Sequence, residues 1–148
     1  MRFENKGVLV TGATGGIGRE TCLQFAAEGA AVAVTDLDLA LAERLANEIE
    51  EKGGRAVGYE LDVTNQEQTD AVVNQAATDL GSIDIIFCNA GIREIQPAHQ
   101  LPLDEWRNVI EVNVTGVFVS AQSFAKHCIS KSKPGVIINT ASTLGVMG

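Results

Sequence analysis

The stretch "VLVTGATGGIGRE", residues 8–20, holds four glycines directly after a short apolar run. Gly12, Gly16 and Gly18 fit the pattern G-x-x-x-G-x-G, and Gly12, Gly15 and Gly18 fit G-x-x-G-x-x-G equally well. A glycine-rich turn between a buried strand and a helix can place the free N–H groups of the helix N-terminus against a phosphate. The two spacings go with different enzyme families, and the glycines alone do not choose between them.

The composition indicates one folded domain. The chain has 148 residues, enough for one hydrophobic core, and 45% of them are hydrophobic. No apolar run approaches the about 20 residues that a membrane-spanning helix needs, so we expect no membrane partner. The net charge of −8 argues against nucleic acid as a partner but does not exclude an anionic cofactor, which a helix N-terminus can bind.

The cysteines and the N-terminal residues indicate a cytoplasmic protein. Cys22, Cys88 and Cys128 are widely spaced and odd in number, so free thiols in a reducing compartment are expected. No C-x-x-C pair or His/Cys cluster suggests a metal site. The residues "MRFENKG" lead directly into a strand pattern and contain no apolar signal-peptide region.

Short apolar runs alternate with helical patterns along the chain. The apolar runs predict strands at 7–12, 30–36, 56–63, 83–91 and 135–142. The helical patterns cover 16–29, 39–54, 64–81 and 103–131, and Thr64 with Glu67 has the spacing of a capping box. This alternation predicts a doubly wound parallel sheet of the Rossmann-like α/β class, with three α/β/α layers, in one dinucleotide-binding domain over residues 1–148.

The glycine loop lies where such a fold binds a nucleotide, between the first strand and the first helix. Gly12 permits a tight turn, Gly16 would let the backbone approach a pyrophosphate, and Gly18 would let the helix pack closely on the strand. A loop of this composition could also be only a turn.

Asp36 ends the second predicted strand, 18 residues after Gly18. A carboxylate at this place can accept hydrogen bonds from both hydroxyls of an adenosine ribose and would repel a 2′-phosphate. No Arg or Lys follows it in "TDLDLA", and none lies in the glycine loop, so NAD is preferred over NADP. The alternative is that Asp36 caps the second helix, a role that Asp38 could serve instead.

Six short motifs stand in one order along the chain. They are "TGATGGIG" at 11–18, Asp36, "LDVT" with Asp62, "NAG" at 89–91, "NVTG" with Asn113 and "INTAS" with Ser142. In this order and at these spacings the whole chain resembles the short-chain dehydrogenase/reductase family. The resemblance favours Gly12, Gly16 and Gly18 as the working spacing, with Gly15 as an additional flexible residue near the phosphates.

With NAD as the cofactor, the resemblance assigns its contacts. The expected cofactor-binding residues are Gly12, Thr14, Gly15, Gly16, Ile17, Gly18, Asp36, Leu37, Asp62, Val63, Asn89, Ala90 and Gly91. Asp62 and Val63 would lie along the adenine, and residues 89–91 would lie beneath the cofactor.

The resemblance also implies two catalytic residues and a reaction. Ser142 would hydrogen-bond the substrate oxygen, and Asn113 would hold a water in a proton relay. We therefore expect an NAD(H)-dependent oxidoreductase that transfers hydride between nicotinamide and a secondary alcohol or ketone. A non-catalytic NAD-binding module and an epimerase/dehydratase-type relative stay open, although "NAG" and "NVTG" argue against the second.

The family's acid/base tyrosine and its lysine lie beyond Ser142, at positions that the 148 residues do not reach. Tyr59, the single tyrosine, belongs to the third predicted strand, so we expect little turnover from these residues alone. We expect the front part of a longer enzyme, with the strand at 135–142 as a bare edge; a short protein that pairs with a partner is the alternative. The stretch 103–131 resembles the family's subunit-packing helix, which predicts a homo-dimer or homo-tetramer of the complete protein.

Overall fold

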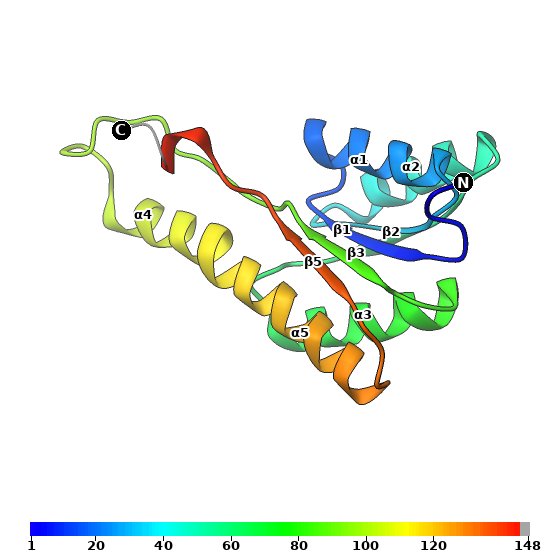
Figure 1. Cartoon of the computed structure of the whole chain (residues 1–148). Coiled ribbons are helices and arrows are strands. Elements are labelled where there is room, and N and C mark those ends of the chain that lie inside the picture. The colour runs from blue at the N-terminus through cyan, green and yellow to red at the C-terminus, as the bar shows by residue number, and fades with distance from the viewer. Residues whose placement is uncertain (146–148) are drawn as a thin grey trace.

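Five parallel strands form one sheet within residues 1–145, the part of the chain that the computed structural model describes (Figure 1). They are β1 (Gly7–Thr11), β2 (Ala31–Asp36), β3 (Arg55–Glu60), β4 (Ile85–Cys88) and β5 (Val136–Asn139). Their order across the sheet is β3-β2-β1-β4-β5, so the direction of winding reverses between β1 and β4. In open α/β sheets, ligands bind at the carboxyl ends of the strands beside this switch point.

Helices cover both faces of the sheet, which confirms the predicted three-layer, doubly wound fold (Figure 1). One face carries α1 (Gly16–Ala27) and α2 (Leu39–Glu51), and the other carries α3 (Gln66–Leu80) and α5 (Gly116–Ser130). A further helix, α4 (Leu103–Ile110), runs into α5 through a π-helical turn at Glu111–Thr115, so the helical stretch predicted at 103–131 is interrupted by that turn.

Alternate residues of β1 supply the two halves of the core. Val8 and Val10 are fully buried in the cluster beneath α1 and α2, which includes Leu45 and Ile49. Leu9 points to the other face and packs in the cluster that includes side chains of α3 and α5. Full burial of an aliphatic side chain is worth roughly 1.5–3 kcal/mol, so the apolar runs of the central strands hold both helical layers.

Three strands are shorter than predicted, and the fifth of the sheet ends at Asn139 instead of the predicted 142. The third strand ends at Glu60 and the fourth at Cys88, whereas the sequence predicted ends at 63 and 91. Leu61 and Val63 remain buried after leaving the sheet, which is why the apolar run continues beyond the paired residues. The chain at both places turns into the site described below.

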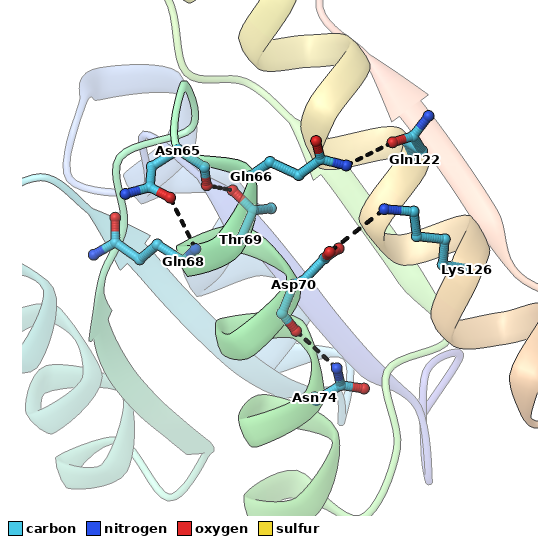
Figure 2. A network of polar contacts seen from close by, with 8 residues as sticks. All are labelled: Asn65, Gln66, Gln68, Thr69, Asp70, Asn74, Gln122 and Lys126. Atoms are coloured by element: carbon cyan, nitrogen blue, oxygen red, sulfur yellow. Dashed lines mark hydrogen bonds and ion pairs between the residues drawn. The ribbon is translucent and has the colours of Figure 1, made fainter.

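The predicted capping box at Thr64 is wrong. The N-cap of α3 is Asn65, whose side-chain oxygen accepts a hydrogen bond from the backbone N–H of Gln68 at 3.0 Å (Figure 2). The hydroxyl of Thr64 instead donates to Oδ1 of Asp62 at 2.7 Å. Asx residues are at least as good as Thr at this position, so the neighbouring carboxylate decides which residue caps.

Polar side chains join α3 to α5 along their exposed margin (Figure 2). Gln66 donates to Gln122 at 2.8 Å, and one turn further along Lys126 approaches Asp70 at 3.4 Å. Exposed pairs of this kind contribute little to stability, about 0–1 kcal/mol each. The two helices are held mainly by the apolar cluster beneath them.

β5 lies at an edge of the sheet in the described residues, paired with β4 alone. Its side chains Val136, Ile137 and Ile138 are all more than one third exposed.

Among residues 1–145, none of the helices combines the length and the apolar character required to cross a bilayer. In the same residues, no group of three or more His, Cys, Asp or Glu side chains could hold a metal ion, and the three cysteines are buried and free.

We predict that Phe124→Ala lowers the free energy of unfolding by about 3–5 kcal/mol, because it empties the centre of the cluster between α5 and the sheet. Phe124 is 1% exposed. Chemical denaturation followed by circular dichroism measures the change, with Ile95→Ala, at a position 78% exposed, as the control that stays near wild type. A loss below 1 kcal/mol for Phe124→Ala would contradict this packing of α5.

Candidate functional site

A cavity of about 840 Å³ opens at the carboxyl ends of β1, β2, β3 and β4. Of the residues predicted to bind a cofactor, all except Gly18 line it. Leu61, Ile92, Arg93 and Val112 also line it and were not predicted. Leu61 and Ile92 adjoin predicted residues in the sequence, whereas Arg93 and Val112 carry no signal in the sequence alone.

The packing of the loop requires two of its four glycines. Gly12 has φ +59°, and a Cβ there would lie 2.7 Å from Cα of Ala90. A Cβ on Gly18 would overlap the carbonyl oxygen of Gly12. Gly15 would meet only an ordinary contact and Gly16 nothing within 4 Å, so the protein's own packing leaves both open toward the cavity and does not choose between the two spacings.

Thr11 and Asn89 tie the glycine loop to the turn after β4. The buried hydroxyl oxygen of Thr11 accepts hydrogen bonds from the backbone N–H groups of Asn89 and Ala90, both at 3.0 Å. The side-chain amide of Asn89 donates to the carbonyl oxygens of Thr11 at 3.1 Å and of Gly12 at 3.0 Å. Thr11 was missed by the sequence analysis, and a polar residue ending an otherwise apolar buried strand is the signal that could have found it.

The carboxylate of Asp36 lines the cavity and bonds back to the protein. Its Oδ2 accepts from the backbone N–H of Thr14 at 2.9 Å and from the Thr14 hydroxyl at 2.7 Å, and its Oδ1 accepts from the N–H of Leu37 at 2.9 Å. The N-cap of α2 is Asp38, which accepts from the N–H of Leu41 at 3.1 Å. The alternative that Asp36 caps this helix is therefore wrong.

Asp62 repeats this arrangement at the end of β3. Its Oδ1 accepts from the backbone N–H of Thr64 at 2.9 Å and from the Thr64 hydroxyl at 2.7 Å. Gln68 holds the same segment through the N–H of Asp62 at 2.9 Å. The cavity therefore has two fixed carboxylates on the side of β2 and β3, while Arg93, on the loop after β4, is the only Lys or Arg among the described residues that line it.

Asn113 lies in the π-helical turn and holds the loop that follows β4. Its Oδ1 accepts from the backbone N–H of Ile92 at 2.9 Å, and its Nδ2 donates to the carbonyl oxygen of the same residue at 2.8 Å. Both ends of its side-chain amide are thus bonded to backbone, which makes Asn113 a positioning residue in this structure. The predicted role in a proton relay stays a prediction.

Ser142 follows β5 and is exposed. Its carbonyl oxygen accepts from the N–H of Gly145 at 3.0 Å, and the nearby N–H of Thr140 donates to the carbonyl oxygen of Cys88 at 3.1 Å, which places this segment beside the end of β4. Neither Ser142 nor Asn113 is among the described residues that line the cavity. The structure thus assembles the predicted cofactor residues more completely than the predicted catalytic pair.

Two other reactive side chains, Tyr59 and Cys88, have raised pKa values. Burial and a hydrogen bond of 2.9 Å to Asp79 raise the pKa of Tyr59 well above its usual range, so its phenol stays protonated. Burial raises the pKa of the Cys88 thiol to about 11, which keeps it neutral and poorly nucleophilic.

Comparison with known proteins establishes the family. The family model for short chain dehydrogenases matches residues 6–148, and the chain belongs to this family. It is 36% identical over 148 residues to cyclohexanol dehydrogenase of Acinetobacter sp. (strain SE19), covering 99% of this chain and 59% of that protein. It is 35% identical over 148 residues to meso-2,3-butanediol dehydrogenase of Serratia marcescens, covering 100% of this chain and 57% of that protein.

Solved structures give the same result. A short-chain type dehydrogenase/reductase from Mycobacterium marinum superposes with a TM-score of 0.94 at 39% identity, covering 98% of this chain and 59% of that one. An NAD⁺-bound xylitol dehydrogenase superposes with a TM-score of 0.93 at 38% identity, covering 100% of this chain and 57% of that one. The chain thus spans less than two thirds of the length of these relatives.

We predict that Gly12→Ala destabilises the fold by at least about 2 kcal/mol, because it adds a strained φ and a clash with Ala90. The same substitution at Gly16, the first residue of α1, meets no atom within 4 Å. Gly16→Ala therefore leaves the free energy of unfolding unchanged or raises it by up to about 1 kcal/mol. Urea denaturation of both variants measures the difference, and equal stabilities would contradict the contact between the loop and the β4 turn.

Proposed function

We propose that this chain binds NAD(H) in the switch-point cavity and forms the cofactor-binding part of an oxidoreductase that transfers hydride between nicotinamide and a secondary alcohol or ketone. The observation that supports this best is the combination, in one cavity, of an open glycine turn at the start of α1 and a fixed carboxylate, Asp36, at the end of β2. The relatives named above are dehydrogenases, which supports the same class of reaction.

The phosphates of the cofactor fit the beginning of α1. No side chain caps this helix, so its first N–H groups, starting at Gly16, are available to an anion. The space beside Gly16 is open, and the turn at Gly15 lines the same cavity. The positive end of the helix dipole adds attraction for a diphosphate in a chain with a net charge of −8.

Asp36 supports NAD in preference to NADP. Its carboxylate can accept from ribose hydroxyls, and it would repel a 2′-phosphate at short range. Arg93, the one cation among the described lining residues, belongs to the loop after β4 and not to the strand ends that carry Asp36 and Asp62. The solved structure of NAD⁺-bound xylitol dehydrogenase, which is similar to this chain over the whole length of this chain, supports the same assignment.

The bound cofactor would supply the hydride acceptor or donor. The residues of this chain would bind and orient the cofactor: the turn at 89–91 lines the cavity, and Asn113 fixes the backbone beside it. We assign to Ser142 a hydrogen bond to the substrate oxygen, and to the segment around Asn113 a water in the proton relay. No described group is placed to act as the acid/base, so turnover by these residues alone is expected to be low.

We predict that calorimetry on the chain finds NAD bound at least about tenfold more tightly than NADP. Production of NADH from a panel of secondary alcohols, measured by absorbance on this chain and on any longer form of the protein, tests the reaction. NAD binding without turnover in either form would favour a non-catalytic NAD-binding module. Tighter binding of NADP would contradict the role of Asp36.

We predict that Gly16→Ala weakens NAD binding by about tenfold or more while leaving the fold intact, because its methyl group occupies the space that a diphosphate needs. The stability measurement described above serves as its control. Unchanged NAD affinity in a folded Gly16→Ala variant would contradict the proposed position of the phosphates.

We also propose a homo-dimer or homo-tetramer of the complete protein, located in the cytoplasm. Apolar side chains recur along one stretch of α4, the π-helical turn and α5, and each is substantially exposed. They are Leu103 (60%), Trp106 (53%), Ile110 (38%), Val114 (57%) and Phe118 (60%). A row of this length on a monomer is typical of an interface. The three buried, free cysteines suit a reducing compartment.

We predict that Phe118→Asp dissociates the oligomer, because it places a charge in the middle of an apolar contact. Sedimentation velocity of the complete wild-type protein should show a dimer or a larger species. The Phe118→Asp variant of the complete protein should sediment as a monomer. Leu41→Asp, at a 46% exposed position on α2, is the matched control and should sediment as the wild type does. A wild-type monomer at all concentrations would contradict the proposed interface.

A further inference from the structure

Arg93 is a cation in the cavity to which the proposed function gives no task. It is exposed, it belongs to the loop after β4, and it is the only Lys or Arg among the described residues that line the cavity. The ion pairs of the described residues use other cations, and the Arg93 side chain forms no hydrogen bond within these residues. The N–H donors of its guanidinium are therefore available to a ligand.

The backbone beside Arg93 is held in place by Asn113. Oδ1 of Asn113 accepts from the N–H of Ile92 at 2.9 Å, and Nδ2 donates to the carbonyl oxygen of Ile92 at 2.8 Å. That carbonyl belongs to the planar peptide unit that joins Ile92 to Arg93. The π-helical turn that carries Asn113 thus fixes the point from which the arginine side chain starts, so the guanidinium is presented to one part of the cavity.

Arg93 lies away from the strand ends proposed for the adenosine of the cofactor. Asp36 and Asp62 lie at the ends of β2 and β3, whereas Arg93 follows β4, on the other side of β1 in the sheet. Ser142, to which we assign the substrate oxygen, follows β5, and β5 pairs with β4. The segments that carry Arg93 and Ser142 therefore leave the sheet from neighbouring strands (Figure 1).

The charge balance of the cavity indicates what Arg93 can bind. The described lining residues carry two carboxylates and this one cation, in a chain with a net charge of −8. A neutral alcohol that displaces water would leave the guanidinium donors without partners. A carboxylate accepts two parallel hydrogen bonds from the same guanidinium, and one cation neutralises it. A phosphomonoester carries a charge of about −1.5 to −2 at neutral pH, which one arginine does not balance.

We propose that Arg93 is a specificity-determining residue that binds the carboxylate of a hydroxy acid substrate. The substrate class is then a secondary alcohol that bears a carboxylate, oxidised to the corresponding oxo acid. In that reaction the carbinol carbon gives its hydride to nicotinamide, the hydroxyl releases its proton to solvent, and the carboxylate is unchanged. The inference rests on the proposed function, since it takes the hydroxyl of this substrate as the group that is oxidised.

The test compares hydroxy acids with their primary amides, which have nearly the same shape and no charge. The complete protein is assayed with NAD⁺ and 2-hydroxybutanoate, 3-hydroxybutanoate or 4-hydroxycyclohexanecarboxylate, and with the three amides. For the wild type, we expect kcat/KM for at least one acid to exceed that for its amide by about tenfold or more, the effect of a hydrogen bond between charged groups.

We expect Arg93→Gln to lower kcat/KM for that acid by about tenfold or more, mainly through KM. The same variant should change kcat/KM for the amide, and the affinity for NAD, by less than about twofold. Arg93→Lys should retain part of the preference, because it keeps the charge and loses the paired donors. Arg44→Gln is the matched control and should behave as the wild type does. Arg44 is an exposed arginine of α2 that does not line the cavity, and its side chain also forms no ion pair or hydrogen bond within the described residues.

The outcomes separate this inference from the function on which it rests. Amides and neutral secondary alcohols used as well as the acids, or an unchanged preference in Arg93→Gln, would overturn the role of Arg93 alone. Weaker NAD binding by Arg93→Gln would assign the guanidinium to a cofactor phosphate and overturn it as well. A folded complete protein that does not bind NAD, or that oxidises neither acids nor neutral alcohols, would contradict the proposed function. Circular dichroism of every variant confirms that folded proteins are compared.

Discussion

The site depends on the cross-link between the glycine loop after β1 and the turn after β4. The amide of Asn89 bonds the carbonyl oxygens of Thr11 and Gly12, while the Thr11 hydroxyl receives two N–H groups of the turn. β1 and β4 are neighbours in the sheet, and the winding reverses between them, so the chain leaves the two strands in different directions. Without these hydrogen bonds, the loop after β1 and the turn after β4 would be independent of each other. With them, the two segments together line one side of a cavity.

The close contact between the glycine loop and the turn after β4 also explains why residue 12 must be glycine. The loop lies so close to the turn that a Cβ would meet the backbone of Ala90, and the positive φ aims the following residues toward α1. The helix then starts at Gly16 with no side-chain cap, its free N–H groups beside the cavity. The availability of these N–H groups to an anion therefore follows from the contact between the glycine loop and the turn after β4, and not from any basic side chain.

The order of strands and helices could be predicted because apolar runs of the central strands are buried on both faces. The ends of the strands could not be predicted, because a residue can stay buried without pairing in the sheet. Leu61 and Val63 stay buried after the chain has left the sheet. The cap of α3 was misplaced for a similar local reason. Thr64 and Asn65 can both cap a helix, and only the position of Asp62 shows that the threonine is already bonded.

The residues of the cavity could be predicted better than what each of them does. Loops at the carboxyl ends of parallel strands meet in space, so the motifs place their residues together. Roles depend on contacts between distant segments, such as Asn89 with Gly12, Asn113 with Ile92 and Thr14 with Asp36. The sequence contains both partners of each contact and nothing that pairs them.

We propose that this chain binds NAD in one cavity, built by the loop after β1 and the ends of β2, β3 and β4. Titration of the ¹⁵N-labelled chain with NAD, followed by amide chemical shifts, tests it most directly. We predict that the largest shifts cluster at Gly15, Gly16, Leu37, Val63 and Gly91, which line the cavity. Shifts that cluster instead around the margin between α3 and α5, or no shifts at saturating NAD, would contradict it.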